Sequence, residues 1–132
     1  MNKEILLEKA FLAMDNAYAP YSNYHVGSAV LCNDGEVFLG ANIENASFGA
    51  TNCGERTAIF ATYANGYRKE DIKAIAIVTS GKKLAAPCGI CRQVLSELLM
   101  PNTPIILSNK IETIETTIKE LLPFNFSKDD LL

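Results

Sequence analysis

Three of the four cysteines stand in a pattern that could bind a metal ion. Cys88 and Cys91 form a Cys-x2-Cys pair, and Cys53 stands about 35 residues before it. The pair alone fits zinc binding, a redox dithiol or chance. The third cysteine favours zinc. Structural zinc sites are almost always closed by four protein ligands, whereas catalytic sites keep three ligands and a water, so three thiolates point to a catalytic ion.

No fourth ligand stands at a convincing spacing. Cys32 and His25 are the two candidates, at opposite ends of one predicted strand. We interpret Cys32 as a free buried thiol, because unpaired cysteine is among the most buried residue types. We interpret His25 as a solvated or hydrogen-bonded histidine.

Glu55 stands two residues after Cys53 and is a candidate acid–base residue. On its own, an acidic residue in the first turn of a helix is explained by the helix dipole. Next to a zinc ligand, the same side chain can point at the open coordination position. Zinc lowers the pKa of a bound water to about 7, and a neighbouring carboxylate can take and return the proton. We therefore predict a catalytic role for Glu55.

Two arginines, Arg56 and Arg92, follow the cysteine motifs closely. Zinc with three thiolates carries a formal negative charge, which weakens its action as a Lewis acid. A guanidinium that donates to a thiolate draws off charge and orients the ligand. We place Arg56 in this supporting role. The sequence does not decide between the two arginines, and an exposed salt bridge is the alternative for one of them.

The first third of the chain predicts a helix followed by a β-hairpin. Apolar residues recur at helical spacing over residues 6–17, and Ala19-Pro20 stops this helix because proline cannot continue it. Strands are expected over about residues 25–32 and 36–42. The Asn33-Asp34-Gly35 segment joins them, since Asp-Gly between apolar runs is a strong hairpin signal.

The next segment predicts a helix and a buried strand. Thr51 or Asn52 can cap a helix that Asn65-Gly66 ends. Residues 74–79 form a short continuous apolar run, which is typical of a strand buried on both faces.

The last third predicts a helix over residues 88–100, with Pro87 in its first turn, where a missing N–H is harmless. A strand follows over residues 103–107, and Pro104 suggests that it lies at the edge of the sheet. A further strand over residues 111–116 and a short helix over residues 117–122 complete the pattern.

This order of elements predicts an α/β fold. We expect a three-layer α/β/α arrangement in which helices cover both faces of a mixed sheet of about five strands. The length of 132 residues suits a single domain over residues 1–132. Both cysteine motifs stand at predicted helix starts that follow strands. Helix N-termini that converge at one end of the sheet could bring the three cysteines together, and their partial positive charge favours thiolates.

Composition narrows the classes of function. The chain is 48% hydrophobic and 20% charged, which fits a globular rather than a disordered protein. Its net charge of −3 gives no basic footprint for nucleic acid. No apolar run reaches the ~18 residues of a membrane span, and Glu4 stands where a secretory signal would be positively charged. We expect a cytoplasmic protein that binds neither nucleic acid nor membranes.

The motifs together resemble the cytidine deaminase superfamily. Its zinc signature matches Cys53-Gly54-Glu55 and Pro87-Cys88-x-x-Cys91. Asn42-Ile43-Glu44-Asn45, Ala19-Pro20-Tyr21-Ser22 and Glu120-Leu121-Leu122-Pro123 are similar to the small, homotetrameric nucleoside deaminases. Many relatives have alanine between the cysteine and the glutamate, where this chain has Gly54, a residue that adds backbone freedom at a helix start.

The resemblance implies a cytidine-deaminase-like fold and hydrolytic deamination of cytidine and 2′-deoxycytidine to the uridine forms, with release of ammonia, in pyrimidine salvage. Cys53, Cys88 and Cys91 would hold one Zn2+ per subunit, and Glu55 would shuttle protons. The chain would form a homotetramer and take a small nucleoside as its substrate.

Four further residues acquire substrate-binding roles from the same resemblance. Asn42 and Glu44 would hold the ribose hydroxyls, for which turn chemistry after a strand is the alternative. Tyr24, where relatives often carry phenylalanine, would lie against the pyrimidine ring. Phe126 would line the site of a neighbouring subunit, or else make a plain core or tail contact.

Three other interpretations stay open. The substrate could be a blasticidin-like antibiotic or a free base, although the Asn42 and Glu44 pair argues against both. The metal could serve only to fold the chain, as in a non-catalytic zinc module. Cys88 and Cys91 could instead form the dithiol of a thiol oxidoreductase.

Overall fold

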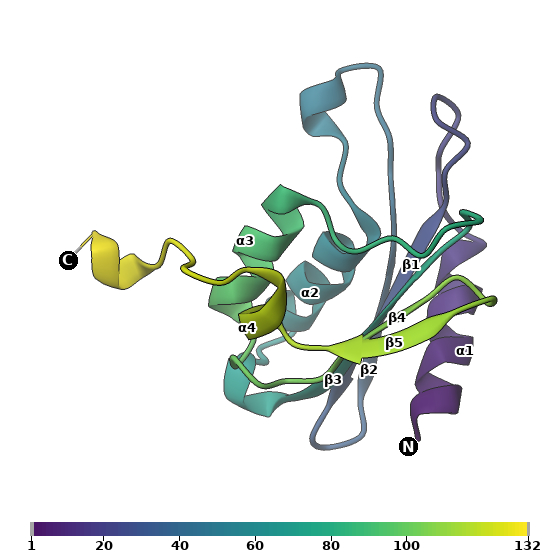
Figure 1. The fold of residues 1–132 in the computed structure, drawn as a ribbon. Helices are drawn as coiled ribbons and strands as arrows, with labels where there is room; N and C mark the ends of the chain where they lie inside the picture. The colour runs from purple at the N-terminus through teal and green to yellow at the C-terminus, as the bar shows by residue number, and fades with distance from the viewer. Residues whose placement is uncertain (1, 132) are drawn as a thin grey trace.

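A five-stranded mixed sheet forms the centre of the protein. The computed structural model describes residues 2–131 and gives the strand order β2-β1-β3-β4-β5 (Figure 1). The five strands are β1 (Val26–Cys32), β2 (Val37–Ala41), β3 (Ile72–Thr79), β4 (Ile105–Ser108) and β5 (Thr113–Thr116). Strands β3 and β4 are parallel, and the other neighbouring pairs are antiparallel. The predicted mixed sheet is confirmed.

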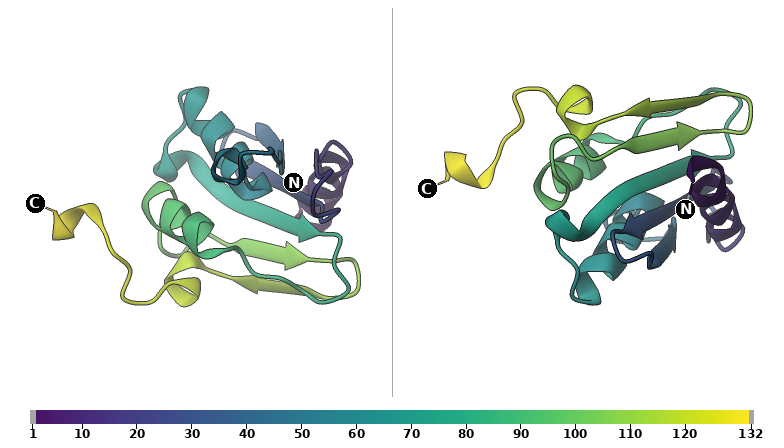
Figure 2. Two further views of the ribbon diagram at one scale, coloured as in Figure 1. Left: turned by 90° about the horizontal axis from the view of Figure 1, so that it is seen from above. Right: turned by 90° about the horizontal axis from the view of Figure 1, so that it is seen from below.

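Helices cover both faces of the sheet, as the α/β/α prediction requires (Figures 1 and 2). Within residues 2–131, the α-helices are α1 (Lys3–Met14), α2 (Gly54–Ala64), α3 (Gly89–Leu98) and α4 (Ile118–Leu121). The same residues include short 3-10 turns, η1 (Phe48–Ala50), η2 (Lys69–Asp71) and η3 (Lys128–Asp130). Helix α1 packs on one face, in a cluster with Ala76 and Val78 of β3. Residues of α2, α3 and α4 pack on the other, in a cluster with Ile75 and Ile77.

The central strand β3 confirms the expectation from its apolar run. It pairs with β1 on one side and β4 on the other, and all but one of its residues are buried. Because successive side chains alternate between the faces, even-numbered Ala76 and Val78 meet α1, and odd-numbered Ile75 and Ile77 meet α2 and α3. Its last residue, Thr79, therefore belongs to the α2 and α3 side.

Both predicted glycine turns are confirmed. Strands β1 and β2 form an antiparallel hairpin with Gly35 in its turn at φ +94°. Gly66 follows the C-cap of α2 at φ +93°. Both angles lie in the left-handed region, where glycine avoids the clash that a Cβ would cause.

The predicted end of the first helix is wrong. Helix α1 starts at Lys3, where the Asn2 side chain accepts from the Ile5 N–H at 2.9 Å, and it ends at Met14 rather than at residue 17. The chain then makes a turn in which Ala17 bonds the Met14 carbonyl. Tyr18 next donates its N–H to Asn42 at 2.9 Å. Pairing with the segment after β2 thus takes the backbone groups that a longer helix would use.

Three details at other element ends also differ from prediction. Helix α2 has Cys53 as its N-cap, not Thr51 or Asn52. Helix α3 has Cys88 as its N-cap, so Pro87 precedes the helix and does not lie in its first turn. Strand β4 is not at the edge, because β5 pairs with it beyond Pro104. Pro104 precedes the first paired residue, so its missing N–H removes no ladder bond.

Among residues 2–131, none of the helices combines the length and apolar character that crossing a membrane requires.

Gly40 of β2 lies directly beneath the first turns of α2. A Cβ built there would stand 2.3 Å from the Ala58 nitrogen and 2.6 Å from the Gly54 carbonyl oxygen. We expect Gly40→Ala to lower the free energy of unfolding by about 1–3 kcal/mol, the usual cost of overpacking, as measured by urea unfolding. Gly49→Ala is the matched control, because a Cβ there meets nothing within 4 Å. Equal stability of the two variants would contradict close packing at Gly40.

Candidate active site

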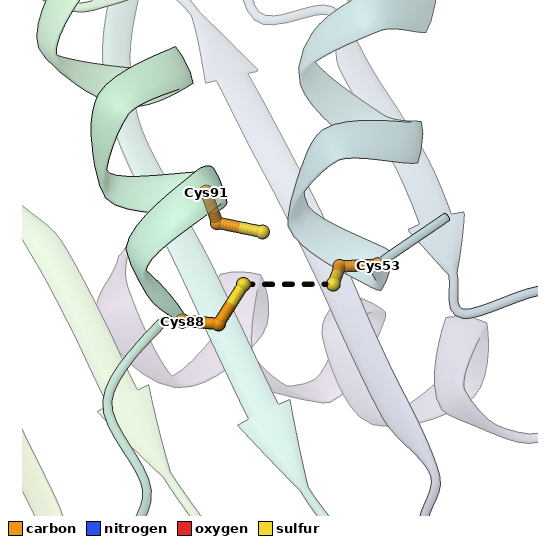
Figure 3. A group of neighbouring side chains, drawn as sticks. All are labelled: Cys53, Cys88 and Cys91. Atoms are coloured by element: carbon orange, nitrogen blue, oxygen red, sulfur yellow. Dashed lines mark hydrogen bonds between the residues drawn. The ribbon is translucent and has the colours of Figure 1, made fainter. Parts of the chain in front are cut away.

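The two cysteine motifs converge at one end of the sheet. Strand β1 is antiparallel to both β2 and β3, so the C-terminal ends of β2 and β3 lie at the same end of the sheet. Helices α2 and α3 start near this end, with Cys53 and Cys88 as their N-caps. Cys91 lies in the first turn of α3. Figure 3 shows the three side chains pointing toward one another, and their sulfur atoms all lie within 4.8 Å.

This geometry fits a zinc ion. Tetrahedral zinc with bonds of about 2.3 Å to sulfur separates its sulfur ligands by about 3.8 Å, and the Sγ atoms of Cys53 and Cys88 lie 3.9 Å apart. Within residues 2–131, no other group of three cysteine, histidine or acidic side chains is close enough to hold a metal.

Neither candidate for a fourth ligand joins this group. Cys32 ends β1, far along the strand from the cluster, and is a free buried thiol whose pKa is raised by burial to about 11. The interpretation of Cys32 is thereby confirmed. His25 precedes β1, where its backbone exchanges hydrogen bonds with Ser80.

Arg56 is the arginine that contacts the cluster. Its Nη2 donates to the Sγ of Cys53 at 3.3 Å. Hydrogen bonds from the Cys91 thiol and from Arg56 lower the pKa of Cys53 to about 5, and the same sharing raises the pKa of Cys91. These contacts favour the thiolate form of Cys53, and a divalent cation is the partner that would allow three thiolates.

Arg92 has a different position. Its Nε donates to the Pro87 carbonyl at 2.8 Å, and its Nη1 donates to the Leu121 carbonyl at 2.7 Å. It thus ties the start of α3 to the end of α4, and it makes no hydrogen bond with the thiols.

Glu55 lies in the first turn of α2 with only 5% of its surface exposed. It lines the same cavity as Cys53 and Cys88. Burial raises the pKa of its carboxyl group to about 6, although its own backbone N–H opposes the shift. A carboxyl group that titrates near neutral pH can both accept and release a proton, which general acid–base chemistry needs.

The cavity beside the cluster has a volume of about 280 Å³. Its lining includes Cys53, Glu55 and Cys88 from the cysteine motifs, together with the polar residues Ser22, Asn42 and Glu44. Small-molecule sites generally combine such a mostly apolar enclosure with a few placed polar groups.

Glu44 is a fixed, ionised acceptor in this cavity. It is 7% exposed and accepts from the Tyr21 N–H at 3.0 Å, from the Ser22 N–H at 3.2 Å and from the Ser22 hydroxyl. These bonds, led by that of the Ser22 hydroxyl, lower the pKa of Glu44.

Asn42 is held equally firmly. Its Oδ1 accepts from the Val26 N–H at 2.9 Å, and its Nδ2 donates to the Tyr24 carbonyl at 2.8 Å. One lone pair and one N–H of this amide are left to meet a ligand.

Tyr24 and Phe126 differ in position. Tyr24 lines the cavity and is 38% exposed, and a Cβ on Gly81 would lie 3.2 Å from its ring. Phe126 lies on the C-terminal extension that leaves the body of the molecule (Figures 1 and 2), is 56% exposed and does not line this cavity. Its carbonyl accepts from Gln93 at 2.8 Å.

Three residues for which the sequence predicts no role support the site or the segment after β3. Ser22 belongs to the Ala19-Pro20-Tyr21-Ser22 motif, and in the structure its hydroxyl group donates to Glu44. Thr79, at the end of β3, lines the cavity. Asn109 is buried outside this cavity, and its Nδ2 holds the segment after β3 by donating to the Gly81 and Lys82 carbonyls at 3.2 Å. No local signal marks Thr79 or Asn109, and the motif that contains Ser22 does not reveal its bond to Glu44, because these roles depend on contacts between distant segments.

Cys53, Cys88 and Cys91 would hold a metal ion that activates water, and the buried carboxyl of Glu55 lies in the same cavity, where it could accept and return a proton. This combination on an α/β/α scaffold places the molecule in the class of zinc-dependent hydrolases.

Comparison with known proteins gives the family. Residues 1–107 match the family model described as the cytidine and deoxycytidylate deaminase zinc-binding region. Over 132 residues the chain is 48% identical to the cytidine deaminase of Halalkalibacterium halodurans, covering 99% of this chain and 98% of that one. The cytidine deaminase of Sporosarcina psychrophila is 43% identical, with 99% and 96% covered.

A solved structure supports the same family. The crystal structure of cytidine deaminase from Burkholderia pseudomallei superposes with a TM-score of 0.91 at 46% identity, and the match covers 96% of this chain and all of that one. The chain belongs to the cytidine and deoxycytidylate deaminase family, a hydrolytic family, and its cofactor is zinc, one ion per subunit. The match removes support for a thiol oxidoreductase and for a non-catalytic zinc module.

The cluster predicts which cysteines the zinc content depends on. We expect Cys88→Ala to lose most of the one equivalent of zinc, because two thiols do not complete the site. Cys32→Ala should keep the full equivalent, since Cys32 lies outside the cluster. Metal analysis of the purified variants measures both. Full zinc retention in Cys88→Ala would contradict the assignment.

Proposed function

We propose that this protein catalyses the hydrolytic deamination of cytidine and 2′-deoxycytidine to uridine and 2′-deoxyuridine, with release of ammonia. The observation that carries the proposal is the buried carboxyl of Glu55 in one cavity with the thiol cluster and the Asn42 and Glu44 pair. The activity is that of the named relatives, which match over nearly the whole chain.

Cys53, Cys88 and Cys91 hold the zinc ion. When bound, zinc supplies the Lewis acidity that makes water nucleophilic near neutral pH. Arg56 donates to Cys53, which withdraws charge from the sulfur and fixes its orientation.

Glu55 moves the protons of the reaction. It takes a proton from the water that adds to C4 and delivers it to N3 of the pyrimidine. It then moves the proton of the new C4 hydroxyl group to the amino group, so that the C4–N bond breaks, ammonia leaves and the C4 carbonyl forms. Its pKa of about 6 suits both directions of transfer.

Asn42 and Glu44 hold the ribose. The ionised carboxylate of Glu44 accepts from sugar hydroxyl groups, and the Asn42 amide can donate and accept. Tyr24 presents its ring to the pyrimidine, as an aromatic side chain beside a flat heterocycle commonly does.

The assembly and cellular place of the protein are part of the same proposal. We propose one catalytic domain over residues 1–132, a homotetramer, and a cytoplasmic role in pyrimidine salvage. The exposed Phe126 on the C-terminal extension supports a contact with a neighbouring subunit's site, because an aromatic ring left in water gains from burial.

Ammonia release from cytidine by the zinc-loaded protein tests the reaction. We expect Glu55→Gln to lower kcat by about 10²–10⁴-fold, the usual contribution of general acid–base catalysis, while the zinc content stays at one equivalent. Glu36→Gln, on the exposed hairpin turn, is the control and should leave kcat unchanged. An inactive wild type that is folded and zinc-loaded would refute the proposed function, and free cytosine should then be tried as substrate.

The ribose assignment has its own test. Glu44→Gln keeps the shape of the side chain and removes its charge, so hydrogen bonds from sugar hydroxyls weaken. We expect KM for cytidine to rise about tenfold, which corresponds to about 1.4 kcal/mol, as measured from initial rates with a cytidine series. An unchanged KM would show that Glu44 does not contact the sugar.

A further inference from the structure

Thr79 carries a buried hydroxyl group that no protein group satisfies. The residue is 5% exposed, and within residues 2–131 its Oγ1 atom has no hydrogen-bond partner. Nearly all buried polar groups in folded proteins are paired, because an unpaired one loses its hydration without compensation. The hydroxyl at this position therefore needs an explanation.

Two other buried hydroxyl groups show that the fold readily satisfies such groups. Ser28 on the adjacent strand donates to the Ala76 carbonyl at 2.8 Å, and Thr62 in α2 donates to the Ala58 carbonyl at 2.8 Å. Thr79 differs from both in lining the cavity beside the metal cluster.

The surroundings of Thr79 would suit an apolar side chain better. Val26 is its partner across the β1 and β3 pairing, and Ile77 precedes it on the same face of β3. Both also line the cavity. Valine has nearly the shape of threonine and favours strands equally well, so the requirements of folding alone would not select a hydroxyl here.

We propose that the Thr79 hydroxyl hydrogen-bonds a polar atom on the edge of the pyrimidine base held in this cavity. The proposal rests on the proposed function, and it adds a base-binding residue to the site. A hydroxyl both donates and accepts, so it can meet a ring carbonyl or an amino group. The apolar side chains of Val26 and Ile77 beside it suit the flat base, whereas Asn42 and Glu44 serve the sugar.

We expect Thr79→Val to raise the melting temperature of the protein and also to raise KM for cytidine. The substitution removes the unpaired hydroxyl, so the zinc-loaded protein without nucleoside should melt at a temperature higher by roughly 2–6 °C. It also removes the contact with the base. KM for cytidine should therefore rise about three- to tenfold, with kcat within about twofold of the wild type. Thr79→Ser keeps the hydroxyl and should restore KM to the wild-type value.

A second pair of measurements tests for a contact with the 2′-hydroxyl group of the sugar and separates binding from turnover. The ratio of KM between Thr79→Val and the wild type should be the same for cytidine and 2′-deoxycytidine, because both carry the same base. Calorimetric titration with uridine should show the same loss of affinity without any reaction. A larger effect for cytidine than for 2′-deoxycytidine would place the contact on the sugar and overturn the proposal.

Failure of this proposal is distinguishable from failure of the proposed function. Thr79→Val with wild-type KM and uridine affinity overturns the base contact while deamination stands. A wild type that releases no ammonia from cytidine refutes the function. In that case, the affinity for uridine and the melting temperature of Thr79→Val still test whether the Thr79 hydroxyl group binds the base. A lower melting temperature in Thr79→Val would show that the hydroxyl serves the fold and would overturn the proposal.

Discussion

In this protein, the sulfur atoms of the three clustered cysteines can bind one metal ion because helices α2 and α3 begin at the same end of the sheet. The sheet meets this requirement through β1, which runs antiparallel to both of its neighbours. The chain leaves β2 and β3 at the same end, and each exit leads into a helix capped by a cysteine. Gly40 lets α2 approach β2 closely enough to bring its first turn over the sheet. The positions of Glu55 and of the cavity follow from that single arrangement.

The site concentrates negative charge in a partly buried volume. Cys53, Glu44 and Glu55 can each be ionised there, and unpaired buried charge is costly. Different hydrogen-bond donors stabilise each of these groups. Arg56 and the Cys91 thiol donate to Cys53. Backbone N–H groups and the Ser22 hydroxyl satisfy Glu44. Glu55 has mainly its own helix N–H, so its carboxyl is left nearest to neutrality, as a proton carrier requires.

Local patterns were enough to predict much of this architecture. The Asp-Gly turn and the apolar run of β3 each specify structure within a few residues, and both are confirmed. The cysteine motifs predict a cluster of three thiols, which the structure also shows. What the sequence could not provide depends on distant segments. The end of α1 is set by pairing of Tyr18 with Asn42, and the interior place of β4 is set by β5. Thr79 and Asn109 gain their importance only when strands meet, and neither belongs to a recognisable motif.

The hydrogen bond from Arg92 to the Leu121 carbonyl shows how far along the chain the folded domain extends. The family model matches residues 1–107, yet the guanidinium group that braces the start of α3 finds an acceptor beyond that region. Ile118 also belongs to the hydrophobic cluster beneath α2 and α3. A fragment cut at residue 107, where the family model ends, would keep every thiol and lose a support of the helix that carries two of them. The structural unit therefore extends beyond the region that the family model describes, and the relatives likewise match this chain over nearly its whole length.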